Sequence, residues 1–110
     1  MSESPYVIRP KADRDLEDQA FYYATVASPE VGHRFLVAAH ETFSLLAKQP
    51  NMGWHPPFKR AEVKLARVFR VKGFEQILIL YVPRTDGVEI LRVIHGSRNV
   101  RDLLRREGLG

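Results

Sequence analysis

The residues best suited to chemistry in this sequence are a histidine and an arginine near its end. His95 is followed by Gly96, Ser97 and Arg98. An imidazole exchanges a proton near neutral pH, and a guanidinium binds phosphate or carboxylate through paired hydrogen bonds. These two groups could therefore serve phosphate chemistry. The structural alternatives are that His95 caps the end of a strand and that Arg98 pairs with Glu89.

A strongly basic segment precedes this pair. Residues 58–72 hold six Lys and Arg side chains and a single Glu. If adjacent strands carry these side chains, they could line one basic concavity that holds a nucleic-acid backbone or an acidic peptide. The alternative is a solvated basic face without a role. The predicted target-binding set is Arg67, Arg70, Arg92, His95, Arg98, Arg101 and Arg105.

Several classes of site are excluded or disfavoured by composition. The chain has no cysteine, which excludes a disulfide scaffold, a thiolate zinc site and a cysteine nucleophile. His33 and His40 lie seven positions apart, too far for a chelating pair on one helix, so neither a metal nor a cofactor is expected. No apolar run approaches the roughly 20 residues of a membrane-spanning helix. With no signal peptide visible, we expect a cytoplasmic protein.

A single domain of 110 residues must position these groups. Period-two runs predict strands, and apolar residues at helical spacing predict two helices separated by Ser28 and Pro29. The expected elements are strand 6–9, helices 11–27 and 29–48, and strands 63–71, 77–82 and 88–94. A short helix could follow from Asn99. We therefore predict an α+β fold of order βααβββ, with a helical hairpin packed on an antiparallel sheet.

The hairpin should bury its apolar stripe against one face of that sheet. We expect contacts between the helical residues Leu16, Ala20, Tyr23, Phe35, Ala38 and Leu46 and the strand residues Val68, Ile77, Ile79 and Val93. The aromatic residues that interleave with the basic segment could stack on bases. For Phe69 and the buried-strand residue Tyr81, a place in the core is the favoured interpretation.

The sequence contains, in order, the stretches Ala12 to Leu16, Arg34 to Leu36, Leu45 to Gly53 and Gly87 to Asn99. Together they resemble the RelE/ParE superfamily of type II toxin–antitoxin toxins, over nearly the whole chain. The last strand and its ending are the most specific part, since they are similar to the "his-gly-ala-arg-asp" ending of ParE-like members. The helix that leads into Pro50 and Gly53 is similar to the family's "leu-ala-x-x-pro-x-x-gly" exit.

The resemblance implies one of two activities. RelE-like members cut mRNA on the ribosome with basic strand residues, a late arginine and often a C-terminal tyrosine, whereas ParE-like members inhibit DNA gyrase. As a ribonuclease, the chain would use Arg70, Lys72, His95 and Arg98. However, strand 77–81 lacks an arginine and no tyrosine follows Tyr81. Gyrase inhibition is therefore favoured, and an antitoxin-binding module with weak or lost toxicity is a third interpretation.

The resemblance also implies a cognate antitoxin as partner. Its C-terminal segment would carry acidic and apolar residues and would wrap the helical hairpin and the sheet, giving a hetero-oligomer. The other partner would be DNA gyrase, or the ribosome and mRNA in the alternative. The predicted antitoxin-binding residues are Leu16, Tyr23, Phe35, Phe69 and Phe74.

Overall fold

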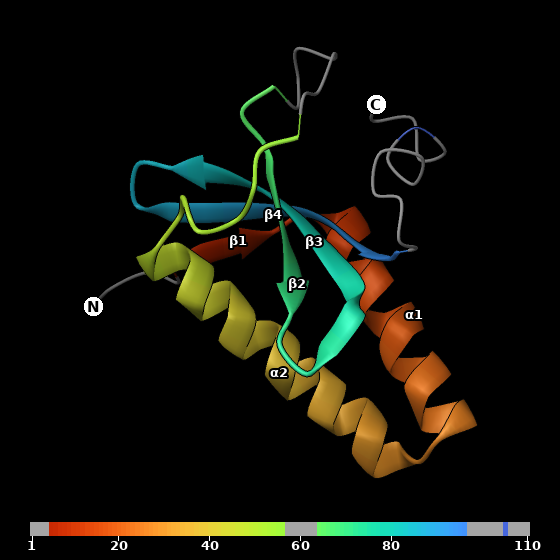
Figure 1. Ribbon diagram of the computed structural model, residues 1–110. Helices are drawn as coiled ribbons and strands as arrows, with labels where there is room; N and C mark the ends of the chain where they lie inside the picture. The colour runs from red at the N-terminus through yellow and green to blue at the C-terminus, as the bar shows by residue number, and fades with distance from the viewer. Residues whose placement is uncertain (1–4, 57–63, 97–104, 106–110) are drawn as a thin grey trace.

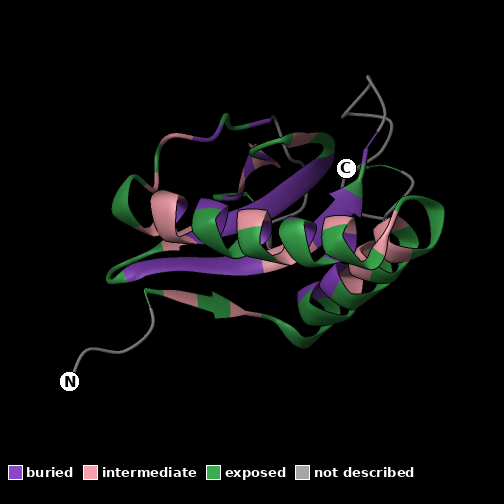
Figure 2. Cartoon of the chain, turned by 90° about the horizontal axis from the view of Figure 1, so that it is seen from below, coloured by how far each residue is buried: buried purple, intermediate pink, exposed green. Residues whose placement is uncertain are grey.

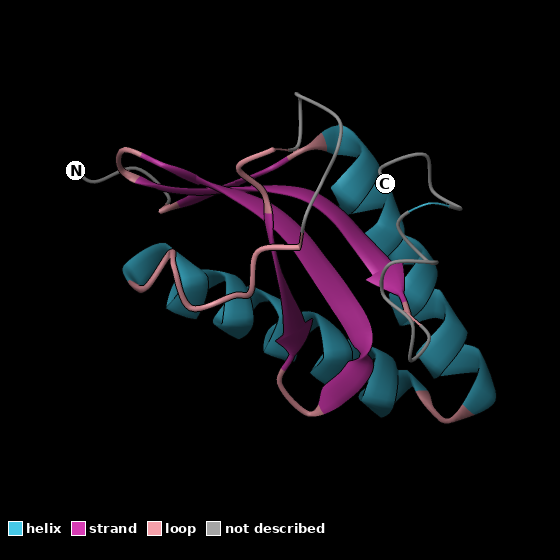
Figure 3. Ribbon diagram, turned by 45° about the horizontal axis from the view of Figure 1, so that its top comes forward, coloured by secondary structure: helices cyan, strands magenta, loops and turns pink. Residues whose placement is uncertain are grey.

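The computed structural model describes residues 5–56, 64–96 and 105 of the chain. Its elements are β1 (Tyr6–Ile8), α1 (Pro10–Val26), α2 (Pro29–Lys48), β2 (Arg67–Val71), β3 (Phe74–Arg84) and β4 (Gly87–His95). Figure 3 shows both helices on one side of a twisted sheet. The expected α+β fold is confirmed. The helix predicted from Asn99 falls outside the described residues, apart from Arg105, which is helical.

Each helix begins at a proline. Pro10 and Pro29 open α1 and α2 at positions where a missing amide hydrogen costs no intrahelical bond. Ser28 caps α2, because its hydroxyl accepts a hydrogen bond from the backbone N–H of Val31 at 3.2 Å. Only two residues separate the helices, so they fold back on each other as an antiparallel hairpin.

The hairpin closes tightly around Gly32 of α2. A Cβ atom at this position would lie 2.8 Å from the backbone oxygen of Ala20 and 3.1 Å from the Cβ of Ala24. Only glycine allows this approach, which fixes the spacing of α1 and α2. The two helices thereby form one layer that packs against the sheet (Figure 1).

The four strands form one sheet in the order β1-β4-β3-β2. Strands β2, β3 and β4 are antiparallel neighbours, and their turns place Gly73 and Gly87 at positive φ angles of 83° and 154°. β1 adds beside β4 in the parallel direction, with Tyr6 opposite Val88. The sheet is thus mixed rather than purely antiparallel. The chain between β1 and β4, which contains both helices and the strands β2 and β3, provides the long connection that parallel neighbours need.

Apolar side chains form two clusters, one on each face of the sheet. The larger lies between the sheet and the helices and includes Phe35, Leu46, Ile79 and Val93. Figure 2 shows buried residues concentrated in the strands and exposed residues along the outer sides of the helices. The smaller cluster consists of Ala66, Val68, Leu78, Leu80, Val82 and Ile94.

The placement of Val68 corrects one expectation. Val68 was expected to face the helices, but it belongs to the smaller cluster on the opposite face. Successive side chains of a strand alternate between faces, and in β2 it is Phe69 and Val71 that pack on the helix side. The expectations for Ile77, Ile79 and Val93 are confirmed, since all three are in the larger cluster.

A set of hydrogen bonds that join Tyr81 and Arg67 to Pro50 and Gly53, which we call the latch, fixes the segment that leaves α2. The hydroxyl of Tyr81 on β3 donates to the Pro50 carbonyl at 2.7 Å and accepts the N–H of Gly53 at 2.9 Å. Arg67 of β2 donates from Nη1 to the Gly53 carbonyl at 2.7 Å. A Cβ at Gly53 would lie 2.6 Å from the Tyr81 hydroxyl. The motif residues Pro50 and Gly53 thus position this loop on the sheet.

We expect Tyr81→Phe to destabilise the protein by about 1–3 kcal/mol, because the change leaves a buried carbonyl and a buried N–H without their partner. Urea unfolding should show a lower midpoint with an unchanged slope. Burial is the main cause that raises the pKa of Tyr81, so its stabilising effect is complete below about pH 10 and is lost as the pH rises through the raised pKa. The variant should lose less stability in that alkaline range.

Tyr22→Phe is the matched control, since Tyr22 is 49% exposed on α1. Removal of its hydroxyl should change the unfolding free energy by less than about 0.5 kcal/mol. Equal effects of the two variants would show that the Tyr81 hydroxyl does not hold the loop.

Candidate functional site

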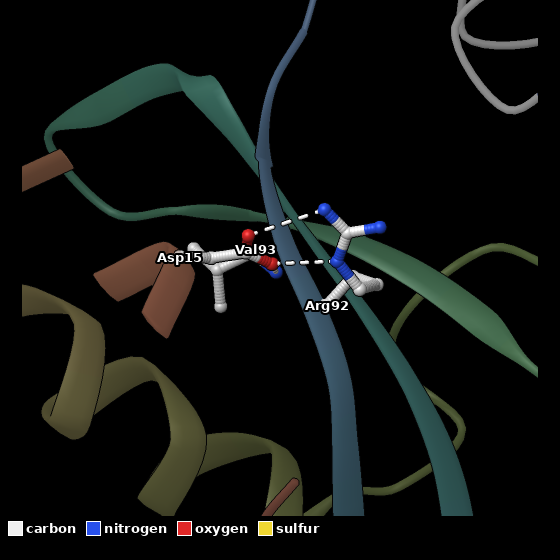
Figure 4. Close-up of polar contacts among 3 residues, drawn as sticks. All are labelled: Asp15, Arg92 and Val93. Carbon is white, nitrogen blue, oxygen red and sulfur yellow. Dashed lines mark hydrogen bonds and ion pairs between the residues drawn. The ribbon is translucent and has the colours of Figure 1, made fainter. Parts of the chain in front are cut away.

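Arg92, a predicted target-binding residue, forms an ion pair with Asp15 of α1 (Figure 4). Its Nε donates to Asp15 Oδ2 at 2.7 Å, and its Nη2 donates to Oδ1 at 3.1 Å. The same Oδ2 accepts the backbone N–H of Val93 at 3.0 Å. The Arg92 and Asp15 side chains are only 15% and 16% exposed. One carboxylate thus receives three hydrogen bonds and joins α1 to β4.

This ion pair lies where β4 runs past the end of β1. The pairing of β1 with β4 ends at Ile8 and Ile90, and the N–H of Arg9 adds one bond to the Ile90 carbonyl at 3.0 Å. From there α1 covers the edge, but the backbone groups within a helix are already bonded to each other. The Asp15 carboxylate supplies the acceptor that a strand would have given. Arg92 is therefore engaged in the fold.

Glu89 gathers two further arginines. It lies in β4 and is 8% exposed. Its Oε2 accepts from Arg9 Nη1 at 2.8 Å, and its Oε1 pairs with Arg84. The sequence suggested Arg98 as a partner for this carboxylate. Arg98 lies outside the described residues, and the described partners of Glu89 are Arg9 and Arg84.

His95 lies exposed at the end of β4. Its Nε2 is 3.1 Å from Gln76 Oε1, and its ring centroid is 6.4 Å from that of Tyr22. A shallow pocket of about 260 Å³ opens beside it, lined by Asp18, Gln19, Tyr22 and His95. Asp18 contributes a carboxylate to this lining, and a carboxylate repels a phosphate. These lining residues include no Lys or Arg that could bind a phosphate.

The basic residues of β2 and Arg92 of β4 have separate bonding partners. Arg67 is bonded to the loop through Gly53, and Arg70 donates from Nη1 to the Glu75 carbonyl at 2.7 Å. β3 separates β2 from β4 in the sheet. The single basic concavity stays a prediction, since Lys59, Arg60 and Arg98 fall outside the residues that the structure describes.

A pocket of about 370 Å³ opens beside β2, and we call it the edge pocket. Its lining includes three residues that the sequence analysis named: Phe69 from the antitoxin-binding set, Arg70 from the target-binding set, and Lys72 from the ribonuclease alternative. Sequence reasoning missed the other three lining residues, which are Met52, Trp54 and Glu75. Trp54 is 44% exposed and forms an isolated antiparallel bridge with Val68. The signal that the sequence offered was the single tryptophan of the chain in a loop that contains glycine and proline.

The five predicted antitoxin-binding residues have different surroundings. Leu16 and Phe35 are 2% and 0% exposed, so neither side chain offers surface to a partner in this conformation. Tyr23, Phe35 and Phe74 form a ring cluster with centroids 5.0 to 5.4 Å apart. Burial, with a smaller contribution from nearby Tyr22, raises the pKa of Tyr23. Of these five residues, Phe69 is the one that lines the edge pocket.

The remaining predicted residues lie at the end of the chain. Arg98 and Arg101 are outside the described residues, and Arg105 is exposed. Within the part that the structure describes, no three His, Asp or Glu side chains are grouped as ligands for a metal ion. In that same part, no helix has the length and apolar character needed to cross a membrane.

We expect Asp15→Ala to destabilise the fold by about 3 kcal/mol, the lower end for a broken buried ion pair, because both partners keep some solvent contact. The change leaves the Arg92 charge and the Val93 N–H without their acceptor. Chemical unfolding measures the loss. In addition, the Val93 amide should exchange its hydrogen faster in the variant.

Asp18→Ala is the matched control one turn away, because Asp18 is an exposed residue of the same helix. It should stay within about 0.5 kcal/mol of the parent. The double variant Asp15→Ala with Arg92→Ala should cost less than the sum of the two single changes. Additive costs would show that the two side chains do not act as a pair.

Comparison with known proteins identifies the family. Residues 6–100 match the family described as the ParE toxin of the type II toxin–antitoxin system parDE. Among solved structures, a chain of the "chromosomal ParDE TA system from P. aeruginosa" is similar, with a TM-score of 0.68 and 20% identity, covering 84% of this chain and 95% of that one. No curated protein is similar enough to count as a match. Because the family match spans most of its length, this chain belongs to the ParE toxin family of type II toxin–antitoxin systems.

Proposed function

We propose that this protein inhibits DNA gyrase in the cytoplasm and is neutralised by a cognate antitoxin. The observation that carries the proposal is the match to the ParE toxin family over residues 6–100. The similar solved chain comes from a ParDE system, which supports an antitoxin as partner. In this proposal the two proteins form a hetero-oligomer, and the toxin acts when it is free of its partner.

The chemistry of the described residues also favours inhibition over RNA cleavage. Cleavage by attack of a 2′-hydroxyl needs a base, an acid and stabilisation of charge at phosphorus. Arg92 is engaged with Asp15, and Arg67 with the latch. The centre of β3 is apolar and buried from Ile77 to Val82. These positions therefore offer no cationic centre for a phosphate, and Arg70 and Lys72 are the described basic residues of the predicted ribonuclease set.

The ribonuclease remains the second candidate because of one observation. His95 presents an exposed imidazole at the end of β4, three residues before Arg98 in the sequence. In this candidate His95 would exchange the proton, and Arg70, Lys72 and Arg98 would bind the RNA backbone. The carboxylate of Asp18 beside His95 weighs against it.

The purified protein should block supercoiling by gyrase or accumulate cleaved plasmid, and it should leave ribosome-bound mRNA intact. The reason is that a ParE-like surface acts by binding gyrase, without cutting RNA. Supercoiling is measured on relaxed plasmid with ATP, and addition of the cognate antitoxin should restore it. That restoration serves as the control for specific inhibition.

Two outcomes would contradict gyrase inhibition. A codon-phased cut in translated mRNA that disappears in His95→Ala would establish the ribonuclease. Inactivity in both assays together with tight antitoxin binding would establish an antitoxin-binding module with lost toxicity.

Arg98→Ala should lower toxicity strongly while its melting temperature stays within a few degrees of the parent. The sequence places Arg98 in the target-binding set, and removal of a charge that binds the target, without a buried ion pair in the fold, should change stability by only about 0–1 kcal/mol. Growth inhibition and thermal melting are measured on the same variants. Arg92→Ala is the contrast, because loss of its ion pair should cost about 2 kcal/mol. A fully toxic Arg98→Ala, or one that is inactive because it unfolds, would remove Arg98 from the target-binding set.

A further inference from the structure

β2 is an edge strand, and the described residues occupy only part of its outer side. It is the last strand in the sheet order, and the only residue bridged to its outer side in the described part of the chain is Trp54. The N–H and carbonyl of Val68 both bond to Trp54, at 2.8 and 3.0 Å. Backbone groups alternate in direction along a strand, so Arg70, two residues later, also points its N–H and carbonyl away from β3.

The edge pocket opens beside this segment of backbone. Met52, Trp54 and Phe69 give it an apolar lining, and Arg70, Lys72 and Glu75 stand around it. The latch of Tyr81 on Pro50 and Gly53 holds the loop that carries Met52 and Trp54. The pocket is therefore formed before a partner arrives. A pocket that is already ordered loses less conformational entropy on binding.

The charge of this edge selects its occupant. Between residues 64 and 75 the described chain carries Lys64, Arg67, Arg70 and Lys72 against Glu75 alone. If a second copy paired antiparallel at this edge around Arg70, the two Arg70 side chains would lie opposite each other. Like charges in that position are destabilising, and cations on edge strands are a known guard against such pairing. The same cations attract an acidic segment.

We propose that the outer edge of β2 at Arg70 binds an extended acidic segment of the antitoxin. One residue of this segment bridges the backbone of Arg70, and a neighbouring apolar side chain of the segment enters the edge pocket against Trp54. Its carboxylates lie near Arg70 and Lys72. This mode combines strand addition with a side-chain pocket. The inference rests on the proposed antitoxin partner and adds where and how that partner docks.

Binding of the antitoxin encoded with this chain tests the proposal by titration calorimetry. Arg70→Glu and Trp54→Ala should each weaken binding by at least about tenfold. Arg14→Glu makes the same change in net charge at an exposed position of α1, and Phe21→Ala removes an aromatic ring that is 74% exposed. Because both control residues lie on α1, which the antitoxin is also expected to contact, they are compared with Thr85→Glu in the exposed turn between β3 and β4 and Val7→Ala, whose side chain is 61% exposed on β1 at the opposite edge of the sheet. The Thr85 and Val7 variants should stay within about threefold of the parent, as expected for residues away from the β2 edge.

Hydrogen exchange on the unmodified protein provides a second measurement that does not depend on any variant. The Arg70 amide should exchange at least about tenfold more slowly in the complex, whereas the Phe69 amide, which points to β3, should change little. Unchanged exchange at Arg70, or equal binding by the two edge variants and the Thr85 and Val7 controls, would overturn the proposed edge site. Protection of Arg70 in the free protein that is lost on dilution would assign the edge to a second copy instead.

These outcomes are distinct from failure of the proposed function. If the unmodified chain does not bind the antitoxin at all, the toxin–antitoxin proposal fails first. If it binds normally and Arg70 shows neither the mutational effect nor the protection, only the edge site fails.

Discussion

The carboxylate of Asp15 determines how the helical layer sits on the sheet. Apolar contacts favour burial of α1 but have no directional preference, so they do not by themselves set its position along β4. Asp15 adds that direction, because it accepts both a guanidinium and a strand N–H within hydrogen-bond distance. Ala12 and Leu16 flank it on the helix and are almost fully buried. Asp15 thus fixes which face of α1 packs against the core. The same residue also provides the hydrogen-bond acceptor for β4 beyond the end of β1.

The arginines of this protein divide between architecture and surface. Arg92 completes the edge of β4, Arg9 and Arg84 neutralise Glu89, and Arg67 holds the loop after α2. A buried carboxylate with two arginines is stable in such a position because each charge has a partner. The count of 17 Lys and Arg residues therefore overstates the number of cations available to a target. Among the described cations of β2, Arg70 stands out because it lines a pocket.

Much of the fold was predictable because local signals carry it. Helical spacing located both helices, Ser28 and Pro29 marked their joint, and the glycines at 73 and 87 marked the turns. The family motif at Pro50 and Gly53 was visible in the sequence, but its reason was not, since the Tyr81 hydroxyl that bonds both residues lies about 30 positions away.

The candidate site was harder to predict, since its contacts are between distant positions. Asp15 and Arg92 are 77 residues apart, and charge type alone does not reveal which cation has a partner. Leu16 and Phe35 have the apolar character that suits either an interface or a core, and the structure places both in the core. The edge pocket depends on the bridge from Trp54 to Val68, which no periodic pattern announces.

The parallel pairing of β1 with β4 has a consequence for when the protein becomes active. Tyr6 and Asp15, made early in synthesis, have their partners in Val88 and Arg92, made some 80 residues later. Contacts so distant in sequence close slowly, and the core cannot close before β4 has emerged from the ribosome. A nascent chain therefore has no finished surface with which to act on the cell. Under the proposed function, this delay would give the antitoxin time to meet the toxin as it folds.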